Sequence, residues 1–273
     1  MLFRSAFLAG AFLVLSVHAY YLLRGRYVEL SQKAFKIALA VATVFSLSQL
    51  LTGHRSAEGV AVNQPAKLAA LEGHFDTLAA ADMYVLGWVD KEKQEITGLK
   101  VPGGLSFLLH NDFKAPVRGL NDFPENERPT ALNAIFQFYH LMVAIGLFMI
   151  ALTLYASFLW WRGKLFRQRW LLWVFVFAVL LPNIANQVGW FTAEMGRQPW
   201  VVYGLLRTSD ALSAAVKANQ VVFSLILFAL IYSLLFALFL YLLDKKIKAG
   251  PESKEHIQER HRQEGIADAL GGA

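Results

Sequence analysis

Apolar residues in this sequence gather into five long segments, separated by stretches in which polar and apolar residues mix. The segments cover residues 2–23, 34–51, 131–160, 170–188 and 221–243. A helix needs roughly 20 apolar residues to cross a bilayer, and each segment is close to or above that length. The first has no small-residue cleavage site after its apolar run, so we interpret it as a span and not as a signal peptide. The pattern predicts an all-α integral membrane protein with about five transmembrane helices.

The stretches between the spans divide the rest of the chain. Residues 53–130 form a long segment of mixed polarity that keeps apolar clusters, so we expect an ordered loop. Its start is predicted to be a short helix that opens at Pro65. The predicted organisation is two transmembrane helices in 1–52, a large loop in 53–130, two helices in 131–188, a shorter outer segment in 189–220, one helix in 221–244 and a polar tail in 245–273.

Basic residues mark one side of the membrane. The stretches 24–36, 162–169 and 244–273 hold four, four and six Lys and Arg, together 14 of the 26 in the chain. With five spans these stretches lie on the same side, and the positive-inside rule makes that side cytoplasmic. The carboxy terminus is then cytoplasmic, and the large loop and the amino terminus are extracytoplasmic. This topology accounts for the formal charge of +6 without a nucleic-acid partner.

Composition narrows the possible chemistry. Charged residues make up 17% of the chain, against about a quarter in soluble domains. The absence of Cys excludes disulfides, thiolate metal sites, iron–sulfur clusters and cysteine nucleophiles. The sequence contains no Walker-type loop, no Gly-x-Ser-x-Gly and no His-x-x-x-His. The candidate chemistry therefore rests on three short polar stretches.

The first stretch, GWFTAEMGRQPW at residues 189–200, follows the fourth span. An interfacial belt explains it: Trp190 and Trp200 anchor at the headgroups, and Glu194 pairs with Arg197 one helical turn on. Polar groups this close to lipid are costly, so the cluster is also a candidate site. The residues alone leave both interpretations open.

The other two stretches are weaker when taken alone. Residues 137–146, QFYHLMVAIG, place Met142 on an apolar helix, where a methionine is usually packing material. Residues 64–73, QPAKLAALEG, place Lys67 and Glu72 on a short helix, where both could simply be exposed to solvent.

Together these stretches resemble subunit I of the cytochrome bd family of quinol oxidases. The string Trp-x-x-x-Glu-x-Gly-Arg-Gln-Pro-Trp at 190–200 is similar to the family's signature, and residues 202–208 continue the match. Residues 137–146 resemble the family's Phe-Arg-x-Met-Val region, with His140 where many members have Arg. Residues 64–73 look like the start of the family's quinol-binding loop, in a short form.

The resemblance implies a haem role for five residues. Met142 would be an axial ligand of a low-spin haem b, and Glu194 of a high-spin haem b. Trp190 would pack against the haems, and Arg197 would lie near their propionates. His140 would serve a propionate when protonated, or be an alternative ligand.

Two further residues are implied in quinol oxidation, which releases two protons and two electrons. Such a site needs an acceptor for a phenolic proton and a donor that orients the oxygen, roles implied for Glu72 and Lys67. The implied function is quinol:oxygen oxidoreduction, with haem d or a third haem b as the oxygen-reducing cofactor. Implied partners are quinol, oxygen, membrane lipid, subunit II and small single-span subunits, in a bacterial or archaeal cytoplasmic membrane.

The resemblance covers the carboxy-terminal half of the family's subunit, whose members have about nine spans. The first span here aligns with the family's fifth, whose His ligand would fall at or just before Met1, and residues 1–4 contain no His. We therefore expect a truncated start or a separate chain for the amino-terminal half, and no turnover by this chain alone. The alternative is a membrane module that binds haem or quinone without reducing oxygen. A secondary transporter is less favoured, because its polar site would lie at mid-membrane.

Overall fold

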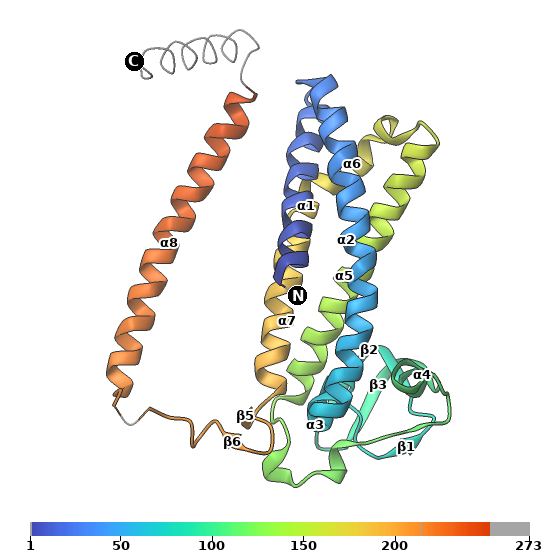
Figure 1. Cartoon of the computed structure of the whole chain (residues 1–273), viewed down its shortest axis with the longest axis vertical. Helices are drawn as coiled ribbons and strands as arrows, with labels where there is room; N and C mark the ends of the chain where they lie inside the picture. The colour runs from blue at the N-terminus through green and yellow to red at the C-terminus, as the bar shows by residue number, and fades with distance from the viewer. Residues whose placement is uncertain (1, 214, 252–273) are drawn as a thin grey trace, which may run out of the picture. The chain divides into compact units, whose positions relative to one another are not determined.

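Four of the predicted spans form one helical bundle within residues 1–212. The computed structural model describes residues 2–213 and 215–251, with side chains from residue 5 onward. The bundle is built by α1 (Leu2–Leu23), α2 (Val28–Asn63), α5 (Leu132–Trp161) and the consecutive helices α6 (Arg169–Ala178) and α7 (Leu180–Gly196) (Figure 1). A fifth apolar helix follows in residues 213–273. The prediction of an α-helical membrane protein with five candidate spans is confirmed.

Helix α2 is longer than the apolar pattern indicated. Its 36 residues extend about 54 Å at 1.5 Å per residue. The hydrocarbon core of a bilayer is about 30 Å thick, so one end of α2 projects beyond it. Residues 53–63, predicted as the start of the large loop, are the last turns of this helix. The helix thereby delivers the chain directly to α3 (Pro65–Glu72).

The fourth span is broken once, between α6 and α7. Pro182 lies in the first turn of α7 and has no N–H for the carbonyl of Ala178. The Asn183 side chain donates to the Val179 carbonyl at 3.0 Å and so satisfies one backbone group near the break. Helix α7 continues to Gly196, so the first part of the predicted 189–220 segment is helical.

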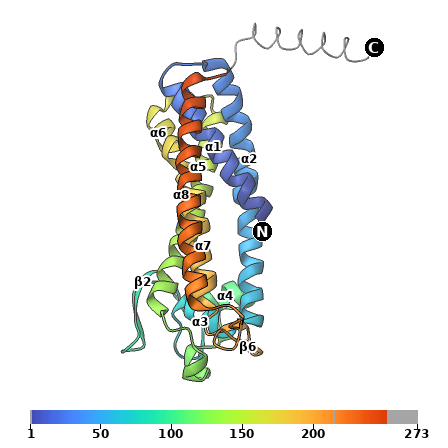
Figure 2. The ribbon, with the colours of Figure 1, turned by 90° about the vertical axis from the view of Figure 1, so that its left-hand side faces the viewer.

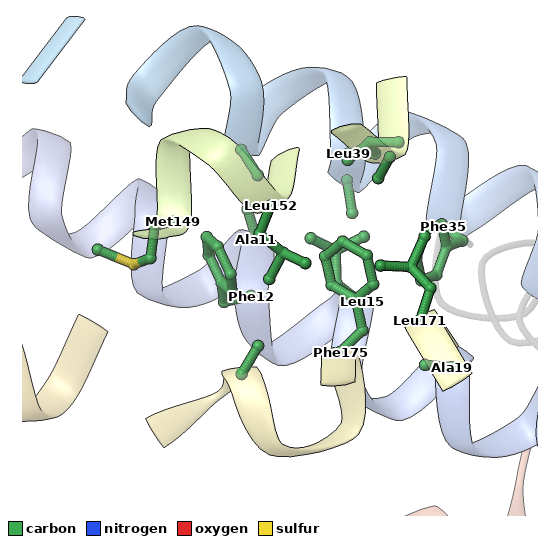
Figure 3. Packing of buried hydrophobic residues seen from close by; sticks show 14 of the residues in the cluster. Ala11, Phe12, Leu15, Ala19, Phe35, Leu39, Met149, Leu152, Leu171 and Phe175 are labelled. Carbon is green, nitrogen blue, oxygen red and sulfur yellow. The ribbon is translucent and has the colours of Figure 1, made fainter. Parts of the chain in front are cut away.

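An apolar core fills the bundle. Aromatic rings from three helices meet there, with Phe35 edge-on to Phe175 at 5.1 Å between ring centroids. Polar side chains inside the bundle bond across it, as Ser16 Oγ does to the Val176 carbonyl at 2.6 Å. The core residues drawn and labelled in Figure 3 are Ala11, Phe12, Leu15, Ala19, Phe35, Leu39, Met149, Leu152, Leu171 and Phe175.

The helices pair in a fixed order. Helix α1 packs along α2 and α6, while α5 packs along α7 and α2. Figure 2 shows the same helices turned by 90°, with α3 and α4 (Gly104–His110) gathered at one end of the bundle. We call this end, where α3 meets the carboxy-terminal turns of α7, the loop end.

The large loop is ordered, as expected, but it contains strands that the all-α prediction did not include. In the described residues, β2 (Met83–Asp90) and β3 (Glu95–Val101) form an antiparallel hairpin, and β1 (Leu78–Ala79) pairs with β4 (Pro116–Val117). Short 3-10 helices follow at Leu120–Asp122, Glu125–Glu127 and, between α5 and α6, Leu165–Arg167. After α7, β5 (Trp200–Val202) pairs with β6 (Leu206–Arg207).

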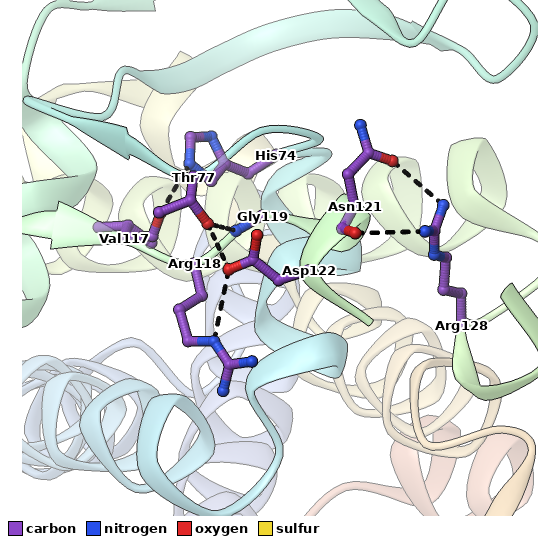
Figure 4. A network of polar contacts seen from close by, with 8 residues as sticks. All are labelled: His74, Thr77, Val117, Arg118, Gly119, Asn121, Asp122 and Arg128. Atoms are coloured by element: carbon purple, nitrogen blue, oxygen red, sulfur yellow. Dashed lines mark hydrogen bonds and ion pairs between the residues drawn. The ribbon is translucent and has the colours of Figure 1, made fainter. Parts of the chain in front are cut away.

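A polar network holds the loop together (Figure 4). Thr77 Oγ1 donates to Asp122 Oδ2 at 2.6 Å and accepts from the Gly119 backbone N–H at 2.9 Å. Arg118 pairs with the same Asp122 oxygen at 3.5 Å. The Arg128 guanidinium donates to Asn121 Oδ1 at 3.1 Å. These bonds join the segment after α3 to the segment before α5 and so fix α3 from its carboxy-terminal side.

The second unit, residues 213–273, contains α8 (Ala218–Ala249). Its first turn is capped by Gln220, whose Oε1 accepts from the Lys217 backbone N–H at 3.0 Å. The helix continues to Ala249, beyond the predicted end of the span at residue 244. The rest of the predicted tail, residues 252–273, lies outside the described residues, and so do the side chains of residues 1–4, next to the place where the family's His would fall.

Candidate functional site

Helix α3 is short and has clear signals at both ends. Pro65 occupies its first turn, where a missing N–H does no harm. Gly73 ends it in the left-handed conformation at φ 64°, where a Cβ would lie 2.6 Å from Ile96 Cδ1. The left-handed conformation favours a glycine there, and a larger residue would also displace the Ile96 side chain. The helix buries most of its length against α2, α5 and α7.

Lys67 reaches from α3 to the carboxy-terminal turns of α7. Its Nζ donates to the Ala193 carbonyl at 3.2 Å. Gly196 leaves room for this approach, because a Cβ there would make a tight contact of 3.3 Å with Lys67 Cγ. Burial lowers the pKa of the Lys67 ammonium, and the nearby Arg197 lowers it further, while Glu194 acts in the opposite direction.

Glu194 and Arg197 form an ion pair beside that lysine. Arg197 Nη2 lies 2.6 Å from Glu194 Oε2, and both side chains are about a third exposed or slightly more, at 35% and 40%. The structure thus brings together Lys67 from one predicted stretch and Glu194 with Arg197 from another, although about 130 residues separate them in the sequence. We call these three residues the charged cluster.

Three buried polar atoms in and beside the charged cluster have no hydrogen-bond partner. Among the described residues, Arg197 Nε, Trp200 Nε1 and Gln64 Oε1 are buried and have no hydrogen-bond partner. All three residues line one small cavity of about 10 Å³ together with Lys67 and Gly196. Because a buried donor without an acceptor costs about 1–3 kcal/mol, the two N–H groups are suited to an anionic or carbonyl oxygen.

Met142 lies on α5 with its sulfur against the backbone of α7. A Cβ at Gly189 would lie 2.7 Å from Met142 Sδ, so the glycine leaves the space that the thioether fills. Met142 is half-buried, whereas Met149, two turns further along α5, is 5% exposed in the apolar core. The Met142 thioether is therefore placed between two helices and near the loop end.

His140 and Trp190 were also predicted to contact cofactors. The two ring nitrogens of His140 lie 2.8 Å from the Phe136 carbonyl oxygen and 2.7 Å from the Tyr84 carbonyl oxygen. Neither nitrogen is free to bind iron in this arrangement, and a contact with a haem propionate stays a prediction. Trp190 is 56% exposed and touches Phe191.

Glu72 is the most deeply buried carboxylate of the site, at 3% exposure. Burial raises its pKa to about 7, and a hydrogen bond from the Tyr139 hydroxyl partly opposes this rise. Its Oε2 has no hydrogen-bond partner. A buried carboxyl that titrates near neutral pH is suited to accept a proton.

Comparison with known proteins decides the family. The family of cytochrome bd terminal oxidase subunit I matches residues 1–251 of this chain. The chain belongs to this family. The recognition made from the three stretches is thereby confirmed.

Several proteins of the cytochrome bd family are similar to the chain. A Bacillus subtilis (strain 168) protein, provisionally named cytochrome bd menaquinol oxidase subunit I, is 36% identical over 92% of the chain and 57% of the relative. Cytochrome bd-II ubiquinol oxidase subunit 1 of Escherichia coli (strain K12) is 27% identical over 95% of the chain and 63% of the relative. The bd oxidase structure from Geobacillus thermodenitrificans matches with a TM-score of 0.79 and 33% identity, over 91% of this chain and 56% of that one. The chain thus spans a little over half of the length of these cytochrome bd relatives.

Four residues of the site in this cytochrome bd family member were not predicted as functional. Gln64, Tyr139, Gly189 and Trp200 all stand inside the quoted stretches, but their roles depend on contacts between helices. A signal for Tyr139 was available, because it stands three positions before Met142 and helical residues three apart are neighbours. Gln64 and Trp200 meet at one cavity from different elements, and Gly189 faces Met142 of another helix, so no local pattern shows these roles.

Proposed function

We propose that this chain provides the quinol-oxidising and haem-binding part of a membrane quinol:oxygen oxidoreductase of the cytochrome bd family. The observation that carries the proposal is the contact between α3 and α7. Lys67 of the predicted quinol stretch donates to the backbone of Ala193, next to the predicted haem ligand Glu194. An electron donor bound at α3 would then be adjacent to the residues that hold the electron acceptor.

In this proposal Glu72 accepts a phenolic proton and Lys67 orients the quinol oxygen. Glu72 has the buried position and the unpartnered oxygen that a proton acceptor needs. Its pKa of about 7 means that the carboxylate form is populated as the pH rises through 7. Quinol oxidation should therefore increase across that range.

The residues present also fit the haems that this family implies. Met142 would hold a low-spin haem b and Glu194 a high-spin haem b, with haem d or a third haem b as the oxygen-reducing cofactor. The unpartnered donors Arg197 Nε and Trp200 Nε1 support this fit, because haem propionates are anionic. When bound, the haems would supply electron transfer and oxygen chemistry. The chain itself would ligate and orient them and place charge around them.

The activity is proposed for an assembled complex. Relatives that carry the oxidase names are longer than this chain. We propose that turnover takes place in a complex with the remainder of subunit I, subunit II and small single-span subunits. The concentration of Lys and Arg in residues 24–36, 162–169 and 244–273 supports a topology with the quinol loop outside and the carboxy terminus in the cytoplasm.

The test is an anaerobic optical difference spectrum of membranes that contain the assembled complex. Added quinol should reduce haem b in the wild type. In Glu72→Gln and Lys67→Gln, dithionite should reduce the same amount of haem as in the wild type. Reduction by quinol should be at least about 100-fold slower in Glu72→Gln, because the general base is lost. It should also be slower in Lys67→Gln, because the donor that orients the quinol oxygen is lost. Lys93→Gln, an exposed lysine at the hairpin turn, is the control and should behave as the wild type.

The same spectrum separates the alternatives. Haem b that quinol reduces but oxygen does not reoxidise would indicate a haem- and quinone-binding module. A stably inserted complex without any haem signal would contradict the proposed function.

A further inference from the structure

The hairpin of β2 and β3 has one side toward the protein. A Cβ at Gly87 of β2 would lie 2.9 Å from Ile96 Cγ2 on β3 and 3.5 Å from Phe136 Cζ on α5. Val89 also points this way and is buried. Because alternate residues of a strand point to opposite sides, the intervening residues and their partners in register form the other side of the hairpin. We call this side the outer face; its residues are Leu86, Trp88, Thr97 and Leu99.

The outer face is apolar although nothing in the chain covers it. Leu86, Trp88 and Leu99 are each 64% exposed. A sheet with one side on the protein usually carries polar residues on the side that faces water. The charged residues of this hairpin stand instead at its two ends. At one end Lys100 pairs with Asp82. Those at the turn are Asp90, Lys91, Glu92, Lys93 and Glu95. The outer face is therefore suited to an apolar or amphipathic environment.

Three polar side chains of α5 fix the level of the hairpin along that helix. Each binds a backbone group of β2, at 3.1, 2.7 and 2.7 Å in order along α5. The pairs are Asn133 with Val89, Gln137 with Gly87 and His140 with Tyr84. Strand β2 therefore lies beside residues 133–140 of α5 and runs in the opposite direction (Figure 1). The turn of the hairpin points away from the middle of the bundle.

This level corresponds to the headgroup region of a bilayer. Residues 141–161 of α5 contain no charged residue and no Asn, Gln or His. They extend about 32 Å at 1.5 Å per residue, which matches a hydrocarbon core of about 30 Å. The exposed apolar residues of α5 begin at Leu141, one position after His140, and Arg162 follows the run at its other end. Residues 133–140, and β2 beside them, therefore lie just outside the hydrocarbon core.

We propose that the outer face of the hairpin is a membrane-contact surface that lies in the headgroup region, with Trp88 as its anchor. Tryptophan is enriched at this level of a membrane because its ring is amphipathic. The pairing of β2 with β3 and the bonds to α5 satisfy the backbone groups that this position removes from water. The Lys100–Asp82 pair stands at the end nearer the middle of the bundle and would be costly in hydrocarbon, so it limits the depth of the hairpin to the headgroups.

The contact would set the level of α3 in the membrane. Val89 of the inner side belongs to the same buried cluster as Ala69, Ala70 and Leu71 of α3. Ile96 also packs on Gly73 at the end of α3. An anchored hairpin would thus hold α3 at the level of the headgroups. The inference goes beyond the proposed function and does not depend on quinol oxidation or on haem.

The experiment is spin labelling of the full chain in the assembled complex, in vesicles of phosphatidylcholine and phosphatidylglycerol. The chain contains no Cys, so one introduced Cys carries its only label, and the complex without this Cys gives the background. Leu99→Cys and Thr97→Cys place the label on the outer face. Lys93→Cys, at the exposed turn of the same hairpin, is the matched control. Relaxation of the label by oxygen, which concentrates in lipid, is compared with relaxation by a water-soluble nickel chelate.

The ratio of oxygen to nickel relaxation should follow the level of each position. It should be highest at position 99, lower at position 97, which is nearer the turn, and lowest at position 93. Leu86→Cys, which stands opposite Leu99 in the register, replaces Leu99→Cys if that variant does not accumulate.

Two results would overturn the proposal. Nickel relaxation at positions 97 and 99 as strong as at position 93 would show that the outer face lies in water. An immobilised label that neither reagent reaches would show that another protein segment covers the face. Because the measurement involves neither quinol nor oxygen reduction, both results would leave the proposed function standing.

Discussion

The middle of the bundle and its loop end are built from the same helices but are occupied differently. In the middle, the buried side chains are apolar apart from hydroxyl groups such as those of Ser16 and Thr153, and Met149 is one of the packed apolar side chains. At the loop end, α3 and α7 bring together four ionisable side chains, Lys67, Glu72, Glu194 and Arg197. In the middle the helices are stabilised by close packing, whereas at the loop end they hold charged side chains near one another.

The largest effect should follow from removing the carboxylate of the charged cluster. Glu194→Gln keeps the shape of the side chain but loses the ion pair with Arg197 and the carboxylate that we propose as a haem ligand. We expect loss of the high-spin haem b signal in the optical spectrum of the assembled complex. Glu125→Gln, in the exposed 3-10 helix Glu125–Glu127, should leave the spectrum unchanged. A wild-type amount of high-spin haem b in Glu194→Gln would contradict the proposal that the loop end binds this haem.

A smaller effect is expected from filling the space that Gly189 leaves for the Met142 side chain. Gly189→Ala would place a Cβ 2.7 Å from Met142 Sδ, so the thioether must shift. We expect a displaced low-spin haem b band or midpoint potential without loss of protein. Gly146→Ala on α5, where no atom lies within 4 Å of the new Cβ, is the control for a glycine in the bundle. Identical spectra for the two variants would contradict the placement of Met142.

The smallest effect concerns the polar network that fixes α3. Thr77→Ala removes the hydroxyl that joins Asp122 to the Gly119 backbone. We expect a loss of about 1 kcal/mol in the stability of the loop, seen as faster proteolysis within residues 64–130, with unchanged haem content. Thr97→Ala, an exposed strand residue, should cleave at the wild-type rate. Equal rates for both variants would show that the network does not hold the loop.

Much of the fold followed from the sequence, because spans are set by long apolar runs that no tertiary contact needs to complete. Two predicted helix boundaries were wrong, one because of tertiary contacts and one because of a proline in the backbone. Helix α2 continues into a mixed-polarity segment that packs at the loop end, and Pro182 breaks the fourth span. The strands of the loop escaped prediction because β2 and β3 are stabilised by their pairing and by α5, where Gln137 donates to the Gly87 carbonyl at 2.7 Å.

The site shows the same division. The three stretches were recognisable as motifs, and the family is confirmed. The sequence does not show which of these stretches lie next to one another. The contact of Lys67 with Ala193 and the contact of Met142 with Gly189 both join separate helices. The departure at His140 could be seen in the sequence, but its bonds to two backbone carbonyls could not.

We propose that haem binds at the loop end of the bundle and not in its middle. The two methionines of α5 test it most directly. Met142→Leu and Met149→Leu make the same volume-conserving change on one helix, two turns apart. In reduced-minus-oxidised spectra of the assembled complex, the account predicts loss of low-spin haem b in Met142→Leu and a wild-type spectrum in Met149→Leu. Retention of low-spin haem b in Met142→Leu, or its loss in Met149→Leu, would contradict the account.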